Sequence, residues 1–223
     1  MEVETSDAKH LQRCILKGTL NMYGIAITGG IACGKSLLCK ILSRLGADVI
    51  DSDEIVKKLH ESGGEGAKVV RDNFGVEFIS EDGATNRVKL AELVFSDNRA
   101  RDKLGRLLHP LVDIELKKWK TGQSSAPVRI AQIPLLFELG WHEEWDLTVC
   151  VVSKEENQIK RLQKRGIGVE EAKRRIRSQM PNAQKVDLAD IVINNDGSEN
   201  ELEIAARELY KYLENGKHGK KTG

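Results

Sequence analysis

The chain has 223 residues, the length of one large domain or of one domain with a small insert. Its 35 Lys and Arg residues nearly balance its 34 Asp and Glu residues, so the formal net charge is +1. This balance argues against a dedicated nucleic-acid-binding protein, which usually carries a strong basic excess. The apolar fraction of 40% argues against intrinsic disorder, because it is sufficient to build a core.

No segment approaches the roughly 18 consecutive apolar residues of a membrane span. The first 22 residues mix acidic and basic side chains and lack the apolar core of a secretory signal. The four cysteines form no Cys-x-x-Cys pair and no spacing typical of a zinc site. We therefore expect a reduced, cytoplasmic protein with no membrane partner and no nucleic-acid partner.

The first part of the chain predicts two strands, each followed by a helix. A loosely ordered extension is expected over residues 1–21, and a buried strand over residues 23–28. Apolar residues at helical spacing then predict a helix over residues 35–45. A second strand is expected over residues 47–51, with a helix over residues 53–60.

Residues 62–126 are poor in strand-like segments, so we expect a helical insertion there, interrupted by turns at Ser80–Gly83 and at His109-Pro110. The remaining expected strands are 128–133, 147–152 and 190–193. The remaining expected helices are 155–165, 169–180 and 199–213. Alternating strands and helices indicate βαβ units, and therefore an α/β fold with a parallel sheet covered by helices on both faces. Residues 215–223 are expected to form a flexible basic tail.

A glycine-rich segment directly follows the first expected strand. Residues 29–36 match the Gly-x-x-x-x-Gly-Lys-Ser pattern of a P-loop, in which backbone N–H groups surround phosphate oxygens. Lys35 can reach the β- and γ-phosphates, and the Ser36 hydroxyl can bind Mg²⁺. The N-terminus of the next helix attracts the same anion. The segment predicts an ATP site formed by Gly29, Gly30, Ile31, Ala32, Cys33, Gly34, Lys35, Ser36 and Leu37.

Two carboxylates, Asp51 and Asp53, lie at the end of the second expected strand. Because ligands of an open α/β sheet bind outside the carboxyl ends of its strands, both side chains are expected near the phosphates. One can orient or deprotonate an attacking hydroxyl, and the other can hold Mg²⁺. The alternative is that Asp53 only caps the following helix.

Residues 154–177 carry nine basic and four acidic side chains, a local charge of +5. Arginine suits phosphoryl transfer because its planar fork binds two oxygens at once and stays charged. We expect a helical hairpin around Gly166–Gly168 to close over ATP as a lid. Arg161 and Arg165 would share one helix face. Most of the other basic side chains are expected to be solvated or paired with acidic neighbours.

Several motifs together resemble the dephospho-coenzyme A kinase family, over about residues 23–213. His109-Pro-Leu followed by Pro134-Leu-Leu-Phe-Glu138 is the specific part, because many kinases share the P-loop. The other motifs are residues 28–36, Ile50–Asp53, Phe74-Gly75, Gln158 with Arg161, Leu162 and Arg165, Arg175 and Ile176 with Gln179, and Ala189-Asp190 with Asn194.

The resemblance implies a P-loop kinase domain over residues 22–214 with three parts. The nucleotide-binding core comprises residues 22–61, 127–153 and 186–214; the helical coenzyme-binding insertion comprises 62–126, and the lid 154–185. The resemblance also implies the reaction, in which MgATP donates its γ-phosphoryl group to the ribose 3′-hydroxyl of dephospho-coenzyme A.

By the same resemblance Asp53 is the base or positioner of the hydroxyl, and it acts with Lys35 and Arg161. Arg161 and Arg165 are expected near the phosphates and adenine, and Asn194 in the adenine pocket. The expected metal ligands are Ser36 and Asp51. The expected acceptor side consists of Asp53, His109, Pro110, Leu135, Phe137 and Glu138.

Some of the expected acceptor-side residues can also be explained by a structural role alone. His109 can be a turn histidine before proline, and residues 134–137 can be core. Glu138 is harder to explain as core, because a carboxylate that ends an apolar run needs a partner.

The family usually has glycine where Ala32 stands, a small polar residue at Cys33, and threonine or another small residue at Leu37. Cys33 lies at a helix N-terminus, where thiol pKa values tend to fall, so we hypothesise that its modification would block the phosphate site. Two other classes of protein fit part of the pattern. They are a nucleoside-monophosphate or shikimate-type kinase, and a nucleotide-gated binding module without an acceptor. We expect a monomer.

Overall fold

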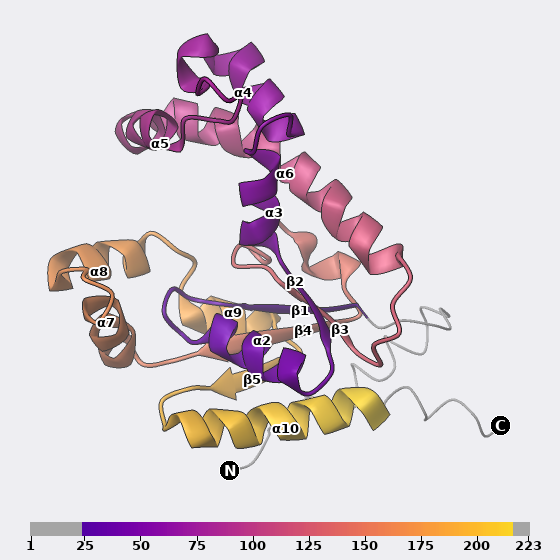
Figure 1. Cartoon of the computed structure of the whole chain (residues 1–223). Coiled ribbons are helices and arrows are strands. Elements are labelled where there is room, and N and C mark those ends of the chain that lie inside the picture. The colour runs from indigo at the N-terminus through magenta and orange to yellow at the C-terminus, as the bar shows by residue number, and fades with distance from the viewer. Residues whose placement is uncertain (1–23, 216–223) are drawn as a thin grey trace. The chain divides into compact units, whose positions relative to one another are not determined.

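The computed structural model describes residues 24–215 (Figure 1). The described residues form two compact units: one contains residues 24–49 and 124–215, and the other contains Ile50–Gln123. The expected extension over residues 1–21, and residues 216–223 of the expected tail, lie outside the described residues.

Five strands form a parallel sheet with the order β2-β3-β1-β4-β5, and all of its residues belong to the first unit except Ile50 and Asp51 of β2. Its strands are β1 (Gly24–Gly29), β2 (Asp48–Asp51), β3 (Arg129–Gln132), β4 (Leu147–Val152) and β5 (Ile191–Asn194). Ala26 of the central strand β1 pairs with Ala131 on one side and with Thr148 on the other. All residues of β1 are buried, as expected for an apolar strand with neighbours on both sides.

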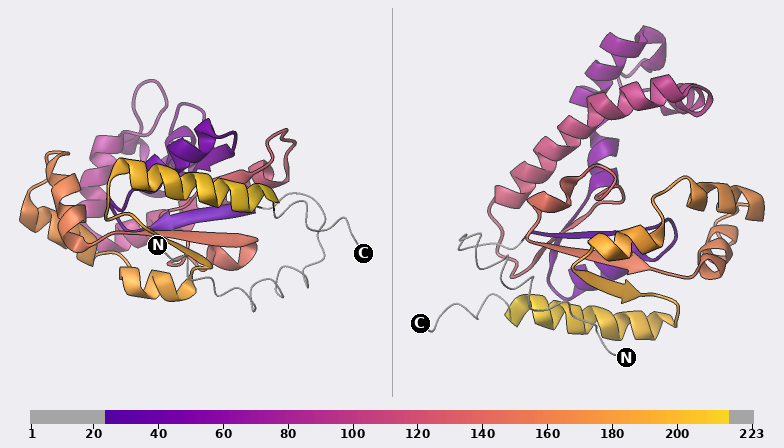
Figure 2. Two further views of the ribbon diagram at one scale, coloured as in Figure 1. Left: turned by 90° about the horizontal axis from the view of Figure 1, so that it is seen from below. Right: turned by 180° about the vertical axis from the view of Figure 1, so that it is seen from behind.

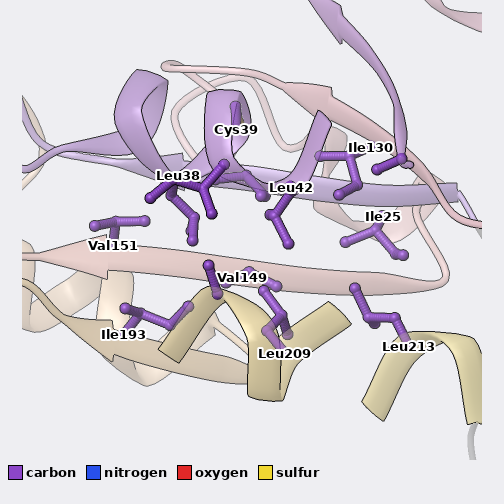
Figure 3. Close-up of a cluster of buried hydrophobic side chains, with 14 of the residues drawn as sticks. Ile25, Leu38, Cys39, Leu42, Ile130, Val149, Val151, Ile193, Leu209 and Leu213 are labelled. Carbon is purple, nitrogen blue, oxygen red and sulfur yellow. The ribbon is translucent and has the colours of Figure 1, made fainter. Parts of the chain in front are cut away.

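Helices cover both faces of this sheet. α2 (Lys35–Arg44) and α10 (Glu199–Asn215) lie on one face, and α9 (Asn182–Leu188) lies on the other. α7 (Glu155–Gln163) and α8 (Val169–Arg177) pack against each other, and a short 3-10 turn, η2, spans Trp141–Glu144. Figure 3 shows the core between the sheet and the two helices α2 and α10. Leu38 and Leu42 of α2 and Leu209 of α10 meet Ile25 and Val149 there. The helix α9 packs against β4, and Figure 2 shows α9 and α10 on opposite sides of the sheet.

The second unit is helical and contains α3 (Ser52–Leu59), α4 (Glu65–Phe74), the 3-10 turn η1 (Val76–Phe78), α5 (Arg87–Ser96) and α6 (Asn98–Thr121). The long helix α6 packs against α3, α4 and α5. The expected turn at Ser80–Gly83 is confirmed, since the Gly83 N–H donates to the Ser80 carbonyl at 2.9 Å. Just beyond the turn, the His60 ring nitrogen Nδ1 lies 2.9 Å from the Thr85 hydroxyl.

The expected break at His109-Pro110 is wrong, because α6 is one helix of 24 residues that runs through Pro110. Proline removes one backbone donor and crowds the preceding turn, yet Leu108, Val112 and Leu116 are buried along the same helix. Packing on both sides of Pro110 therefore keeps the helix intact.

Two further boundaries differ from those expected. The second unit begins at Ile50 rather than at residue 62, because α3 packs against α4 and α6 of that unit. The expected helix over residues 169–180 ends at Arg177, and a separate helix, α9, begins at Asn182.

Candidate active site

The P-loop joins the central strand β1 to α2 and requires glycine at two positions. Gly34 has a φ of 106°, and a Cβ atom there would lie 2.1 Å from Nδ2 of Asn195. A Cβ atom at Gly29 would lie 2.1 Å from the Val151 carbonyl oxygen of the neighbouring strand β4. The end glycines of the motif therefore allow the backbone to turn in a space where a side chain would collide.

The P-loop lysine contacts its own loop. The Lys35 ammonium donates to the carbonyl of Gly29 at 2.8 Å and to that of Gly30 at 2.9 Å. These two carbonyls thus hold the cation that the motif assigns to the phosphates.

The next three loop carbonyls accept hydrogen bonds from side chains outside the loop. Gln158 donates to Ile31 at 2.6 Å, and Asn195 donates to Cys33 at 2.8 Å. The Arg161 Nη1 atom donates to the carbonyls of Ala32 at 3.1 Å and Cys33 at 3.3 Å. The loop is therefore fixed from its carbonyl side by residues more than 100 positions away in the chain.

Arg161 lies on α7, half-buried, with its guanidinium bonded to backbone rather than directed to solvent. In addition to the loop carbonyls, its Nη2 atom donates to the Asn195 carbonyl at 2.6 Å. Arg165 lies one turn later, after the end of α7, and is exposed. The expected arginine pair thus has one member bound to the P-loop and one at the surface.

Three other basic side chains of the hairpin pair with acidic neighbours, as expected for a solvated helix pair. Lys173 pairs with Glu170, and both Arg174 and Arg175 pair with Glu171. These contacts are largely exposed and add little stability.

The hairpin α7–α8 packs directly on the P-loop. Ala32 is buried with Leu162 of α7 and Ala172 of α8. Its φ of 58° is in the left-handed region, which explains why a glycine would suit this position. Burial of the Ala32 methyl group against the two helices offsets part of that backbone strain.

The expected fall in the pKa of the Cys33 thiol is wrong. The Cys33 side chain is fully buried in the core between α2 and the sheet. Burial raises the pKa of this thiol, and the nearby Lys35 charge opposes that effect only in part. The side chain therefore lies in an apolar environment that disfavours the thiolate.

The two expected carboxylates lie at the start of α3 in the second unit. Asp51 caps this helix, because its Oδ1 atom accepts from the Asp53 N–H at 2.9 Å. The capping residue is thus Asp51, and the alternative that Asp53 is the cap is wrong. Burial raises the pKa of Asp51. Asp53 is exposed in the first helical turn.

His109 and Pro110 lie in the middle of α6, also in the second unit. The His109 ring lies next to Gly105 one turn earlier, where an added Cβ atom would be 3.1 Å from Cε1. Burial lowers the pKa of His109, which favours the neutral ring.

The segment Pro134–Glu138 follows β3 in the first unit. Leu135 is 40% exposed, whereas Phe137 is buried, so the core alternative holds for Phe137. The expected partner of Glu138 is Lys185 of α9, whose Nζ atom lies 2.7 Å from Oε1. We did not anticipate Lys185, because no local pattern links two residues 47 positions apart.

Asn194 is exposed at the end of β5, and the next residue, Asn195, is the one that contacts the P-loop. Side chains of successive residues in an extended chain point to opposite sides, so those of Asn194 and Asn195 face in opposite directions. The expected role of Asn194 in an adenine pocket stays a prediction.

The donor chemistry available for Mg²⁺ is a hydroxyl, Ser36, and a carboxylate, Asp51. Both are oxygen donors, and Mg²⁺ commonly takes one or two protein ligands together with phosphates and water. Within residues 24–215, no group of three or more His, Cys, Asp or Glu side chains is placed to hold a metal ion. None of the helices in this range has the length and apolar character of a membrane span.

A parallel sheet whose central strand leads into a P-loop, flanked by helices, defines the class of P-loop kinases. Shikimate kinase from Acinetobacter baumannii shares this fold, with a TM-score of 0.52 and 16% identity over 90% of this chain and 97% of that one.

The chain belongs to the dephospho-CoA kinase family, whose model matches residues 23–201. It is 35% identical to the dephospho-CoA kinase of Bdellovibrio bacteriovorus, with 86% of this chain and 97% of the relative covered. It is 38% identical to that of Nitrosospira multiformis, with 85% and 96% covered. Among solved structures, TT1252 from Thermus thermophilus matches with a TM-score of 0.73 and 32% identity, over 86% of this chain and 98% of that one. The resemblance found in the sequence is confirmed, and the protein is a kinase.

Proposed function

We propose that the protein transfers the γ-phosphoryl group of MgATP to the 3′-hydroxyl of the ribose of dephospho-coenzyme A, giving coenzyme A and ADP. The observation that carries this proposal is the complete P-loop of a chain that matches the dephospho-CoA kinase family over residues 23–201. The class of shikimate-type kinases shares only the fold at 16% identity.

On the donor side, the backbone of residues 29–37 holds the ATP phosphates, and Lys35 exchanges its two loop carbonyls for phosphate oxygens. Arg165 supplies a further positive charge from the surface of the lid. Arg161 contributes charge beside the loop while it holds the carbonyls of Ala32 and Cys33. Asn194, with the buried Asn195, belongs to the adenine side.

On the acceptor side, Asp53 orients the ribose 3′-hydroxyl and accepts its proton. A bond forms between the 3′-oxygen and the γ-phosphorus, while the bond from the γ-phosphorus to the β,γ-bridging oxygen breaks and ADP leaves with that electron pair. The proton passes from Asp53 to solvent. His109, Pro110, Leu135 and Glu138 complete the acceptor side.

Ser36 and Asp51 are the residues that would hold Mg²⁺. When bound, the ion neutralises charge on the β- and γ-phosphate oxygens. Because a cation favours the ionised form of a neighbouring carboxyl group, it would oppose the effect of burial on Asp51.

The test is ATP consumption with a panel of acceptors: dephospho-coenzyme A, pantothenate derivatives, nucleoside monophosphates and shikimate. We expect acceleration by dephospho-coenzyme A alone, and a product that carries a 3′-phosphate by mass spectrometry and NMR. No acceleration by this acceptor would overturn the proposal.

Asp53→Asn should lower kcat about 10²- to 10⁴-fold, because the amide cannot accept the hydroxyl proton. ATP affinity, measured by calorimetry, should change less than about twofold, since the loop is unaltered. The matched control is Glu54→Gln, which removes the neighbouring exposed carboxylate of the same helical turn and should retain activity. Equal turnover by Asp53→Asn and the wild type would refute the assignment of the base.

A further inference from the structure

Lys185 is a charged side chain with no exposed surface. Its Nζ atom lies 2.7 Å from Oε1 of Glu138 and 3.3 Å from the carbonyl oxygen of Pro134. A lysine is almost never fully buried unless it is paired. One side chain of α9 therefore binds both ends of the segment Pro134–Glu138.

The same Pro134 carbonyl also accepts from the Thr28 hydroxyl at 3.2 Å. Thr28 is the residue directly before the P-loop glycine Gly29. The segment that follows β3 is thus tied at a single oxygen both to the strand that leads into the P-loop and to α9.

The surroundings of this ion pair have a low dielectric constant. Cys150 of β4 experiences the charges of Lys185 and Glu138, and burial raises the pKa of its thiol to about 12. An ion pair in such surroundings is weak support for stability, because well-packed apolar residues often serve equally well. A fully buried lysine paired with a half-buried carboxylate therefore favours a role in positioning.

One oxygen of the pair has no partner. The Glu138 Oε2 atom is buried and accepts no hydrogen bond within the described part of the chain. An unsatisfied buried acceptor is costly, so a donor from a bound molecule is expected at this atom. Oε1 is held by Lys185, which leaves Oε2 in a fixed orientation.

We propose that Lys185 is a positioning residue of the acceptor side, which holds the Glu138 carboxylate so that Oε2 accepts a hydrogen bond from a hydroxyl or N–H group of the acceptor molecule. This inference rests on the proposed function. It assigns to α9, the helix that follows the hairpin α7–α8, a role in acceptor binding that does not involve ATP.

The test compares Lys185→Met, Glu138→Gln and the double variant Glu138→Gln/Lys185→Met with the wild type. Lys185→Met leaves a buried unpaired carboxylate and is expected to lower the melting temperature, whereas the double variant removes both charges and should melt near the wild type. The double variant therefore shows the functional effect in a folded protein. Lys173→Met, which removes an exposed lysine paired with Glu170, is the control.

In the double variant, the KM for dephospho-coenzyme A should rise about tenfold, while ATP affinity by calorimetry changes less than about twofold. Glu138→Gln alone should have about the same KM as the double variant, because the two residues act as one unit. A purely structural pair predicts wild-type KM values in the double variant, and that result would overturn the inference. An equal loss of ATP affinity would overturn it as well.

The wild-type control separates the two proposals. If the wild type phosphorylates dephospho-coenzyme A and the double variant has the same acceptor KM, only the role of Lys185 fails. If the wild type does not use this acceptor, the proposed function fails and the inference fails with it.

Discussion

Backbone conformation at individual P-loop residues determines which substitutions the ATP site tolerates. Gly34 has a φ of 106° and lies against Asn195, whereas Ala32 adopts a φ of 58° with a side chain in place. An L-residue in this region costs roughly 1–2 kcal/mol. At Ala32 the cost is partly offset by the buried methyl group, and at Gly34 the space is already occupied.

Gly34→Ala should weaken ATP binding at least about tenfold, because the new methyl group displaces Asn195 from the Cys33 carbonyl. Ala32→Gly is the matched variant. It relieves the left-handed strain and loses about 0.8 kcal/mol of methyl burial, so the free energy of unfolding should change by less than about 1 kcal/mol. Calorimetric titration with ATP and denaturant unfolding measure the two effects. Wild-type ATP affinity in Gly34→Ala would contradict this account.

At the same scale, the residues that the sequence singles out belong to short contiguous motifs. The P-loop and the Pro134–Glu138 segment are contiguous, so their spacing is visible in one dimension. Lys185 and Asn195 act through contacts with residues 47 and 162 positions away, and no periodicity encodes such pairs. The sequence indicates that Glu138 needs a partner, but the identity of that partner, Lys185, depends on the fold.

At the scale of elements, α7 joins the lid to the ATP site through Arg161. Its guanidinium bonds to the carbonyls of Ala32, Cys33 and Asn195, so the helix supports the loop from outside. The strands β1, β3 and β4 were predicted to within a few residues because each is a short apolar run. The boundaries of the helices were predicted less accurately. The helix α6 passes through Pro110, because packing outweighs the local preference of proline to end a helix.

Arg161→Met should raise the KM for ATP about tenfold or more, because the Ala32 and Cys33 carbonyls lose a charged donor, although the Cys33 carbonyl keeps its hydrogen bond from Asn195. Arg174→Met, which removes an exposed arginine paired with Glu171, should leave the KM for ATP within about twofold. Steady-state kinetics at saturating acceptor provide the comparison. Similar KM values for the two variants would show that the loop does not depend on α7.

At the scale of the whole molecule, the buried histidines of the second unit and the buried cysteines of the first unit should reduce stability at opposite ends of the pH range. In the second unit, burial lowers the pKa of His60, assisted by the charge of Arg87, and burial also lowers the pKa of His109. In the first unit, burial raises the pKa of Cys33, and raises that of Cys150 from 9.0 to about 12.

The signs follow from which state binds more protons. Below about pH 6.5 the unfolded histidines are protonated while the folded ones resist, so the second unit loses stability as the pH falls. Above about pH 9 the unfolded thiols ionise while the folded ones do not, so the first unit loses stability as the pH rises. Hydrogen exchange followed separately in the two units should show these opposite trends. His60→Gln should reduce the acid loss and Cys150→Ala the alkaline loss; unchanged profiles in both variants would contradict the explanation.

The position of β1 in the sheet has a consequence for the order of events during synthesis. Both neighbours of β1, the strands β3 and β4, lie after Gln123 in the chain, whereas the second unit is one continuous stretch, Ile50–Gln123. On a translating ribosome the helical unit is therefore complete before the strand that carries the P-loop can acquire either partner. β1 is therefore synthesised before the other strands but gains its partners late. About 120 further residues must be made before its backbone can be paired on both sides.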